Sequence, residues 1–390
     1  MNLKFLHKDN FQFSLFLKND ISMIYSNIDV TCNESNIYKN SKKTSDNALN
    51  IYSHSLHPSY LESKVKSNFI CKKAFQKLGF AINLSDYNSA DDYVKTHCKS
   101  SFKKTLNRSV KRLEGCFDVS YKMHFGEISI EDYQNLMAVL HTMLTKRFEQ
   151  RDDNNEILHD WDFYLNNSFA QINNKQASLF VILSGTEPIE ISLNYHFDSI
   201  IYSHISSYNL DYSKFSLGNI EIYKQLEWCL DNNFNIFDMG YGDFDYKRRW
   251  SNLIYNFNHN IVCHPKNIFG GFLKFILKTK YMLINYLISK NVNVYYNNVK
   301  RYFKGNPNRA NSKPFEFKSE SIEHIIKCNS IEYERLDIDN KEFSFLRKPL
   351  FDFLYTFKEH IGAITIYKVS EDKKSFLFIG KSNTNKITIN

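Results

Sequence analysis

Residues 179–206 read LFVILSGTEPIEISLNYHFDSIIYSHIS, and this stretch decides the fold. Two turn signals, Gly185–Pro188 and Asp198–Ser199, divide it into three apolar segments. The middle segment, Ile189–Phe197, alternates strictly between apolar and polar side chains, which is the pattern of a strand. Asp198–Ser199 is short enough for a tight hairpin. We therefore predict an antiparallel meander of three strands, at 179–183, 189–197 and 200–206.

Segments with helical periodicity precede and follow this meander. Ser129, with Asp132 three residues later, resembles a capping box and opens an amphipathic helix that runs to Phe148. A basic helix is expected from Ser89 to Glu114, ended by a glycine. The other expected elements are a strand at 79–84, a strand at 117–123, helices at 161–172 and 218–231, and strands at 235–239 and 253–257. This order lacks the strict strand–helix alternation of a dinucleotide-binding Rossmann array.

Two sequence motifs follow the third strand of the meander. Residues 201–218 read IYSHISSYNLDYSKFSLG, and residues 237–250 read FDMGYGDFDYKRRW. Together they resemble the signature of the CelD/BcsL-like acetyltransferases, Y-x-x-x-Y-x-x-x-P-G followed by D-x-G-x-G-D-x-x-Y-K-x-x-W. These enzymes are relatives of the FemAB aminoacyl transferases. The second motif is the more specific, because in the first Leu217 stands where the family has Pro. The resemblance covers about residues 86–264.

The resemblance implies the GNAT fold, an α+β fold in which helices flank a mixed sheet, and the element order above is the order of that fold. We divide the chain into four parts. These are a partial, eroded GNAT-like unit at 1–85, the acyltransferase domain at 86–268, a basic amphipathic helix at 269–304, and a small α+β unit at 312–390. In the last part we expect a helix at 345–360 and strands at 363–369 and 376–379.

The resemblance also implies a place for the co-substrate, acetyl-CoA or another acyl-CoA. In the GNAT fold, the loop before the helix at 218–231 presents backbone N–H groups and a positive helix end to the pyrophosphate of coenzyme A. Ser216, Leu217, Gly218 and Asn219 occupy that place. Gly218 would let the phosphates approach the backbone closely. The alternative is structural, with Ser216 as a helix cap and Gly218 as a turn residue.

Three residues of the second motif are candidates for catalysis. Acyl transfer needs a group that deprotonates the acceptor and a group that protonates the leaving thiolate. By the resemblance, Asp243 is the candidate base or acceptor-orienting group, Tyr246 the candidate acid, and Lys247 a contact for a phosphate or an anionic acceptor. The structural alternative is that the aspartates cap turns. For Trp250 we favour a place in the core.

Further candidates lie on the flanking elements. Arg147 matches a basic position of the family and could face the site, but we favour the alternative, a solvated helix end near the negative pole of the helix dipole. His204 and Tyr208 lie where the GNAT sheet opens, but a lone histidine on a strand is more often a core residue. The basic residues between Lys99 and Arg112 form a solvated face, or in a second interpretation an RNA-binding surface.

Composition restricts the remaining choices. The net charge of +8 suits anionic ligands without choosing among them. The seven cysteines are odd in number and widely spaced, so we expect neither disulfides nor a zinc site, and a reducing, cytoplasmic compartment. No histidine pair has metalloprotease spacing, so no metal cofactor is expected. The apolar and basic segment from Phe269 to Tyr302 docks on the core or, in the alternative, contacts the inner membrane surface peripherally.

The function that these motifs predict is acyl transfer from acyl-CoA to an amine or hydroxyl, with a small molecule, a sugar or a polysaccharide precursor as the acceptor. A first alternative is a FemAB-like transferase that uses aminoacyl-tRNA, the one case in which we expect a nucleic-acid partner. A second alternative is a degenerate GNAT scaffold that binds a partner without catalysis.

Overall fold

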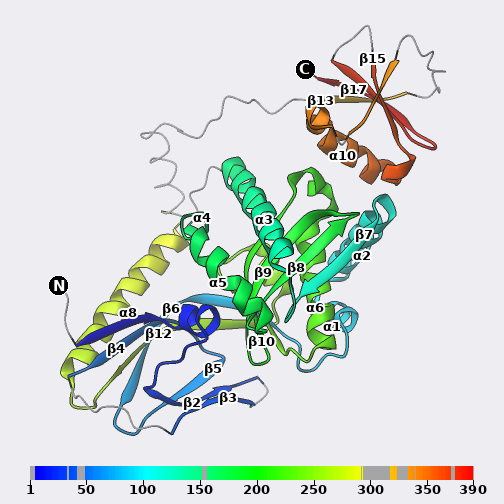
Figure 1. Ribbon diagram of the computed structural model, residues 1–390. Helices are drawn as coiled ribbons and strands as arrows, with labels where there is room; N and C mark the ends of the chain where they lie inside the picture. Colours follow the sequence, from blue (N-terminus) through cyan, green and yellow to red (C-terminus); the bar gives the residue numbers. More distant parts are fainter. Residues whose placement is uncertain are drawn as a thin grey trace.

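A computed structural model describes residues 5–32, 35–41, 49–151, 156–290, 292, 317–322, 333–338, 340–369 and 374–389 (Figure 1). Its centre is a nine-stranded mixed sheet with the order β1-β4-β12-β6-β11-β10-β9-β8-β7. The strands, in that order, are Leu6–Asn10, Ile51–Pro58, Leu253–Cys263, Ile70–Asn83, Ile236–Tyr241, Ile200–Tyr208, Glu187–Phe197, Ala177–Ser184 and Val119–His124. Beside it lies a three-stranded sheet of β2 (Tyr25–Val30), β3 (Ser35–Lys39) and β5 (Leu61–Val65).

The predicted meander is confirmed. Strand β8 pairs antiparallel with β9, with Leu179 opposite Leu193, and β9 pairs antiparallel with β10, with His196 opposite Ile201. The hairpin turn between β9 and β10 has Asp198 in the left-handed region. This arrangement, together with the order of the flanking helices, is a GNAT-like fold, as the sequence indicated.

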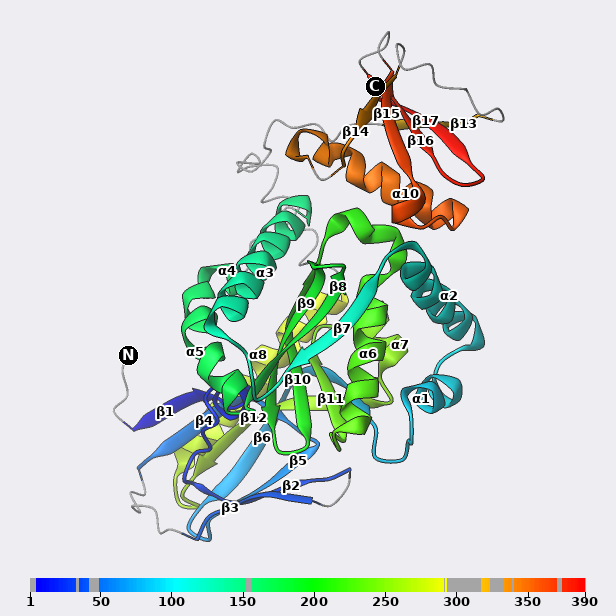
Figure 2. The same ribbon diagram turned by 45° about the vertical axis from the view of Figure 1, so that its right-hand side comes forward.

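Helices cover both faces of the strands β7 to β10 (Figure 2). On one face lie α3 (Ile130–Arg151), α4 (Glu156–His159) and α5 (Trp161–Asn173), and on the other α1 (Ala90–His97), α2 (Ser100–Cys116) and α6 (Leu217–Asp231). Alternate residues of β8 divide between two cores, since Leu179 and Val181 belong to one cluster and Phe180 and Ile182 to another. The central strands therefore bury both of their faces.

The basic helix expected at 89–114 is two helices. Cys98 and Lys99 have extended backbones, which separate α1 from α2. Gly115 lies inside the last turn of α2, which ends at Cys116, and the ring of the next residue, Phe117, packs against Tyr212. The helix therefore does not end at the glycine.

The N-terminal segment completes the large sheet. Strand β6 pairs antiparallel with both β11 and β12, and β4 pairs with β12 on the other side. This segment therefore pairs directly with the strands of the GNAT-like sheet. The interpretation of residues 1–85 as an eroded GNAT-like unit stays a prediction.

The C-terminal unit has five antiparallel strands in the order β13-β17-β16-β15-β14 and one main helix, α10 (Arg347–Phe357). The strands are Phe317–Ser321, Thr384–Ile389, Ser375–Ile379, Thr365–Val369 and Tyr333–Leu336. The helix expected at 345–360 begins and ends two to three residues inside those bounds, after a 3-10 turn at Lys341–Leu346. Helix α10 packs against α2, where Arg112 donates a 2.6 Å hydrogen bond to the Tyr355 carbonyl.

The long apolar helix expected at 269–302 is seen as α8, Ile268–Ser289. Residues 293–302 lie outside the described residues. Among the helices that the structure describes, none combines the length and the apolar character needed to cross a bilayer.

Candidate active site

A cavity of about 390 Å³ opens where β10 and β11 diverge. The two strands are parallel partners only from Ile200 to Tyr202, opposite Ile236 to Asp238. Beyond that point β10 continues towards Tyr208 without β11, and α6 follows β10 through the 3-10 helix η2, Leu210–Phe215. The cavity is lined by residues of α3, α4, β10, α6, β11 and α7 (Asp245–Trp250).

The predicted cofactor residues lie together at one end of this cavity. Ser216, Leu217, Gly218 and Asn219 all line it. Ser216 is in the left-handed region with φ 60°, and its side chain makes no capping hydrogen bond to α6. Leu217 and Gly218 are the first residues of α6, where backbone N–H groups have no partner within the helix. A Cβ at Gly218 would meet no atom within 4 Å, so the cavity reaches this part of the backbone.

Lys247 lies on α7 and is buried. Its Nζ donates hydrogen bonds to the carbonyl oxygens of Met239 (2.6 Å) and Tyr241 (2.5 Å), at the end of β11. Burial lowers the pKa of the Lys247 ammonium to about 8, although the charge of Asp238 opposes the shift. The residue therefore supplies a positive charge to the cavity wall that is lost in mildly alkaline solution.

The other two catalytic candidates differ in position. Tyr246 lines the cavity, with a partly exposed ring stacked on Phe244. Asp243 is not among the described residues that line the cavity, and its exposed carboxylate accepts hydrogen bonds from the Arg248 guanidinium. That interaction holds the pKa of Asp243 below its usual range. A carboxylate stabilised in this way is a weak proton acceptor, and its role as base stays a prediction.

Asp238 and Trp250 are structural. Asp238 is fully buried and accepts hydrogen bonds from the hydroxyls of Tyr60 and Tyr255 and from the Gly240 N–H. Trp250 is also fully buried, as expected, and its indole N–H donates to the Asn219 Oδ1 at 3.1 Å. The second motif therefore fixes the loop after β11 and connects it to the first turn of α6.

The flanking candidates meet at the same cavity. Arg147, His204 and Tyr208 all line it. The Arg147 guanidinium donates to the Ser206 carbonyl at 3.4 Å and lies 5.0 Å from the centre of the Tyr208 ring. The His204 ring lies between the hydroxyls of Tyr202 and Tyr164, at 3.1 and 3.0 Å, and burial lowers its pKa to about 4. His204 is therefore a neutral hydrogen-bonding group.

Two buried glutamates at the cavity were not among the candidate residues that the sequence indicated. Glu221 of α6 lines the cavity, and Glu190 of β9 lies beside it. Ser192 Oγ lies 2.7 Å from one carboxylate oxygen of each. Ser206 Oγ lies 3.3 Å from Glu190 Oε1 and 3.0 Å from Glu221 Oε2.

A serine hydroxyl carries one proton, so two such contacts on Ser192 require a second proton on a carboxyl group. Burial raises the pKa of Glu221, and burial together with the Glu221 charge raises that of Glu190 well above its usual value. The charge of Arg147 opposes both shifts. The pair therefore holds one shared proton beside one cation, and the cavity wall there carries little net charge.

The signal for this pair was present in the alternation of Ile189–Phe197. Its polar positions, Glu190, Ser192, Asn194 and His196, are all buried because α6 covers that face. Asn194 donates to Gln225, which lies four residues after Glu221 on α6. Both faces of this strand are therefore buried, and polar groups on α6 match polar groups on β9.

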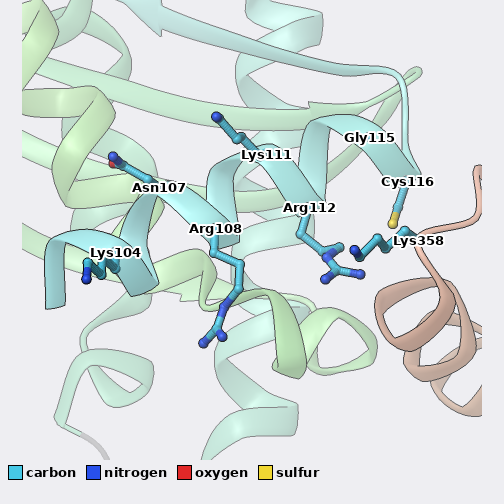
Figure 3. A pocket seen from close by; sticks show the side chains of 8 residues that line it. All are labelled: Lys104, Asn107, Arg108, Lys111, Arg112, Gly115, Cys116 and Lys358. Carbon is cyan, nitrogen blue, oxygen red and sulfur yellow. The ribbon is translucent and has the colours of Figure 1, made fainter. Parts of the chain in front are cut away.

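A second cavity of about 480 Å³ lies along α2 (Figure 3). Its lining is basic: Lys104, Arg108, Lys111 and Arg112 come from α2, and Lys358 follows α10. No acidic side chain of the described residues lines it. Helix α2 also contacts η2 and α6, so this cavity lies on the outer side of the elements that carry the cofactor candidates.

No group of His, Cys, Asp or Glu in the described part of the chain has the geometry of a metal site.

Part of the chain matches a known protein family. Residues 100–248 match the family described as acetyltransferase (GNAT) domain. No curated protein matches the sequence.

Three solved structures have a similar arrangement. FemX matches at 10% identity and a TM-score of 0.40 over 54% of this chain and 71% of its own. L-PGS from Bacillus licheniformis matches at 9% identity and a TM-score of 0.35 over 58% and 72%. A GCN5-related N-acetyltransferase from Kribbella flavida matches at 8% identity and a TM-score of 0.28 over 56% and 68%.

Proposed function

We propose that this chain, in which residues 100–248 match a GNAT acetyltransferase domain, transfers an acyl group from an acyl-CoA to an amine or hydroxyl. The observation that carries the proposal is the cavity between β10 and β11. It brings together the start of α6, the Lys247 charge and the glutamate pair. We further propose a sugar or polysaccharide precursor as the acceptor, which the resemblance of the two motifs to the CelD/BcsL-like enzymes supports.

The start of α6 suits a diphosphate. The N–H groups of Leu217 and Gly218 and the positive helix end favour an anion, and the space at Gly218 gives it access. The shared proton of Glu190 and Glu221 lowers the negative charge that an incoming phosphate would otherwise meet. Lys247 adds a cation to the wall that α7 contributes.

Residues of this cavity also suit the proton transfers of acyl transfer. Glu221 takes the proton of the attacking amine or hydroxyl as the new bond to the acyl carbon forms and the carbon–sulfur bond breaks. Tyr246 returns a proton to the leaving sulfur. We propose Glu221 for the first step in place of Asp243, because Asp243 is engaged by Arg248.

Ligand binding by paired glycine variants tests the cofactor site. Gly218→Val should weaken binding of acetyl-CoA about tenfold or more in calorimetry, since a branched side chain would occupy the space for the phosphates. Gly115→Val is the matched control, because it too is a helical glycine with no atom within 4 Å of a Cβ. Equal affinity of wild type and Gly218→Val would place the cofactor elsewhere.

The basic cavity of α2 favours a second candidate function, transfer from aminoacyl-tRNA. Its cations suit a phosphate backbone, and such binding weakens steeply with salt. Titration with charged tRNA at several salt concentrations, for the wild type and for Lys104→Gln/Arg108→Gln/Lys111→Gln, separates the two functions. If the wild type binds tRNA and the triple variant does not, the result supports the second function. A protein that binds neither tRNA nor acyl-CoA would be the non-catalytic scaffold.

A further inference from the structure

We propose that helix α8 docks on the surface of a lipid bilayer that contains anionic headgroups, lying in the plane of the interface. This proposal does not depend on the proposed reaction. It rests on the exposure of apolar side chains on α8 and on the placement of its lysines.

The inward face of α8 is fixed by contacts with the large sheet. Leu273 and Leu277 pack against Ile261 and the cysteine at the end of β12. Gly270 lies so close to that cysteine that a Cβ would clash with its sulfur. Further along the helix, the Tyr281 hydroxyl lies 2.7 Å from the His259 ring. The helix is therefore attached to the sheet along most of its length and cannot rotate to bury its other face.

The outward face is nevertheless apolar. Phe269, Phe272, Phe275, Ile276, Met282 and Leu283 are all exposed, with Phe272 and Phe275 at 64% and 67%. Their spacing of three, four and seven residues places them on one side of a helix. An exposed apolar stripe of this kind marks an interaction surface, because soluble proteins rarely leave large apolar side chains clustered in water.

The lysines of α8 indicate which partner the apolar stripe binds. Three lysines border the stripe, and at about 100° per residue Lys280 lies on one flank while Lys274 and Lys278 lie on the other. The segment 268–289 contains no Asp or Glu. An apolar face bordered by lysines suits an interface with anionic lipids, where the chains accept the rings and the headgroups accept the ammonium groups. A second copy of α8 on the same face would instead bring like charges together.

Vesicle co-sedimentation of the full-length protein tests the proposal. The wild type should sediment with phosphatidylcholine–phosphatidylglycerol vesicles, and less with phosphatidylcholine alone. Phe272→Ser/Phe275→Ser should lower the partition coefficient about tenfold or more, since two large apolar groups no longer enter the interface. Lys274→Gln/Lys278→Gln/Lys280→Gln should remove the preference for the anionic vesicles. Ile130→Ser, an exposed apolar residue of α3, is the control and should bind as the wild type does.

Circular dichroism and thermal midpoints should match the wild type for the α8 variants, because the changed side chains are exposed. Sedimentation equilibrium of each protein, without vesicles, reports self-association. Vesicle binding that is equal in wild type and Phe272→Ser/Phe275→Ser would overturn the proposal. So would a wild-type dimer that the same substitutions dissociate and that shows no vesicle binding.

Discussion

The Tyr60 hydroxyl donates a 2.8 Å hydrogen bond to the Asp238 carboxylate, across 178 positions of the chain. Both groups are buried, and Asp238 lies on β11 as the second residue of the motif at 237–250. The bond therefore connects the N-terminal segment to β11, the strand that precedes the helix carrying Lys247.

Removing that bond should weaken the whole fold. Tyr60→Phe leaves Asp238 with the Tyr255 hydroxyl and the Gly240 N–H, so we expect a loss of about 1–3 kcal/mol in the free energy of unfolding. Urea denaturation measures it. Tyr286→Phe, at an exposed ring on α8, is the control. An unchanged midpoint for Tyr60→Phe would mean that the bond is not needed.

Ligand binding should depend on pH through Lys247. Its pKa of about 8 means that the ammonium loses its proton as the pH rises through that value. Affinity for an anionic acyl-CoA should therefore fall between about pH 7 and pH 9 in the wild type. Calorimetry across this pH range measures the affinity for acyl-CoA. Lys247→Met should bind acyl-CoA weakly at pH 7, and its affinity should not fall further as the pH rises.

The free energy of unfolding should also depend on pH through Lys247, but in the opposite direction to ligand affinity. The unfolded lysine titrates near 10.5 and the folded one near 8. Between these values the unfolded state binds more protons, so the Lys247 contribution to stability rises with pH. Substitution to alanine should also leave the carbonyls of Met239 and Tyr241 without their donor. Because Lys247 is also buried, we expect Lys247→Ala to lower the free energy of unfolding.

Turnover should depend on Glu221. Glu221→Gln keeps the size of the side chain and a hydrogen-bonding group for Ser192, but removes the proton acceptor. We expect kcat to fall by about 100-fold or more, with the acyl-CoA affinity nearly unchanged. Asp243→Asn is the comparison, and should have the smaller effect. The reverse order would restore Asp243 as the base.

Acid should destabilise the protein through its buried histidines. Burial lowers the pKa of His57 and His196 to about 3 and that of His204 to about 4, against 6.5 when unfolded. The unfolded state takes up protons first, so stability falls as the pH drops below 6.5 and continues to fall towards 4. Each of these three histidines should lower the free energy of unfolding by roughly 2 kcal/mol at pH 5, relative to pH 7. Urea midpoints between pH 7 and pH 5 test this, and His196→Gln should show a shallower slope.

The elements that the sequence predicted best have strong local signals. The meander at 179–206 and the amphipathic helix after Ser129 appear as expected, because turn residues and periodicity act over a few positions. The cofactor candidates Ser216 to Asn219 line one cavity with Tyr246 and Lys247, since both motifs follow strands that end at the same opening.

What the sequence could not supply depends on contacts between distant segments. Glu190 pairs with Glu221 through Ser192, and the alternation around Glu190 does not show which distant residue it meets. The central position of β6 follows from pairing with strands more than 150 residues later. The five strands of the C-terminal unit were only partly predicted, because β13, β14 and β17 are short and weakly apolar.

The position of β6 between β11 and β12 also determines when the protein can fold. Strands β4 and β6 leave the ribosome by residue 83, but their common neighbour β12 is complete only at residue 263. Until then the edges of β4 and β6 that face β12 have no partner, although β1 can already pair with β4, and such unpaired edges are prone to pair with other chains. Closing the sheet also requires loops of high sequence separation, which slows folding. The opening between β10 and β11 is therefore among the last features of the large sheet to form during synthesis, and a fragment limited to residues 100–248 would leave β11 without its β6 neighbour.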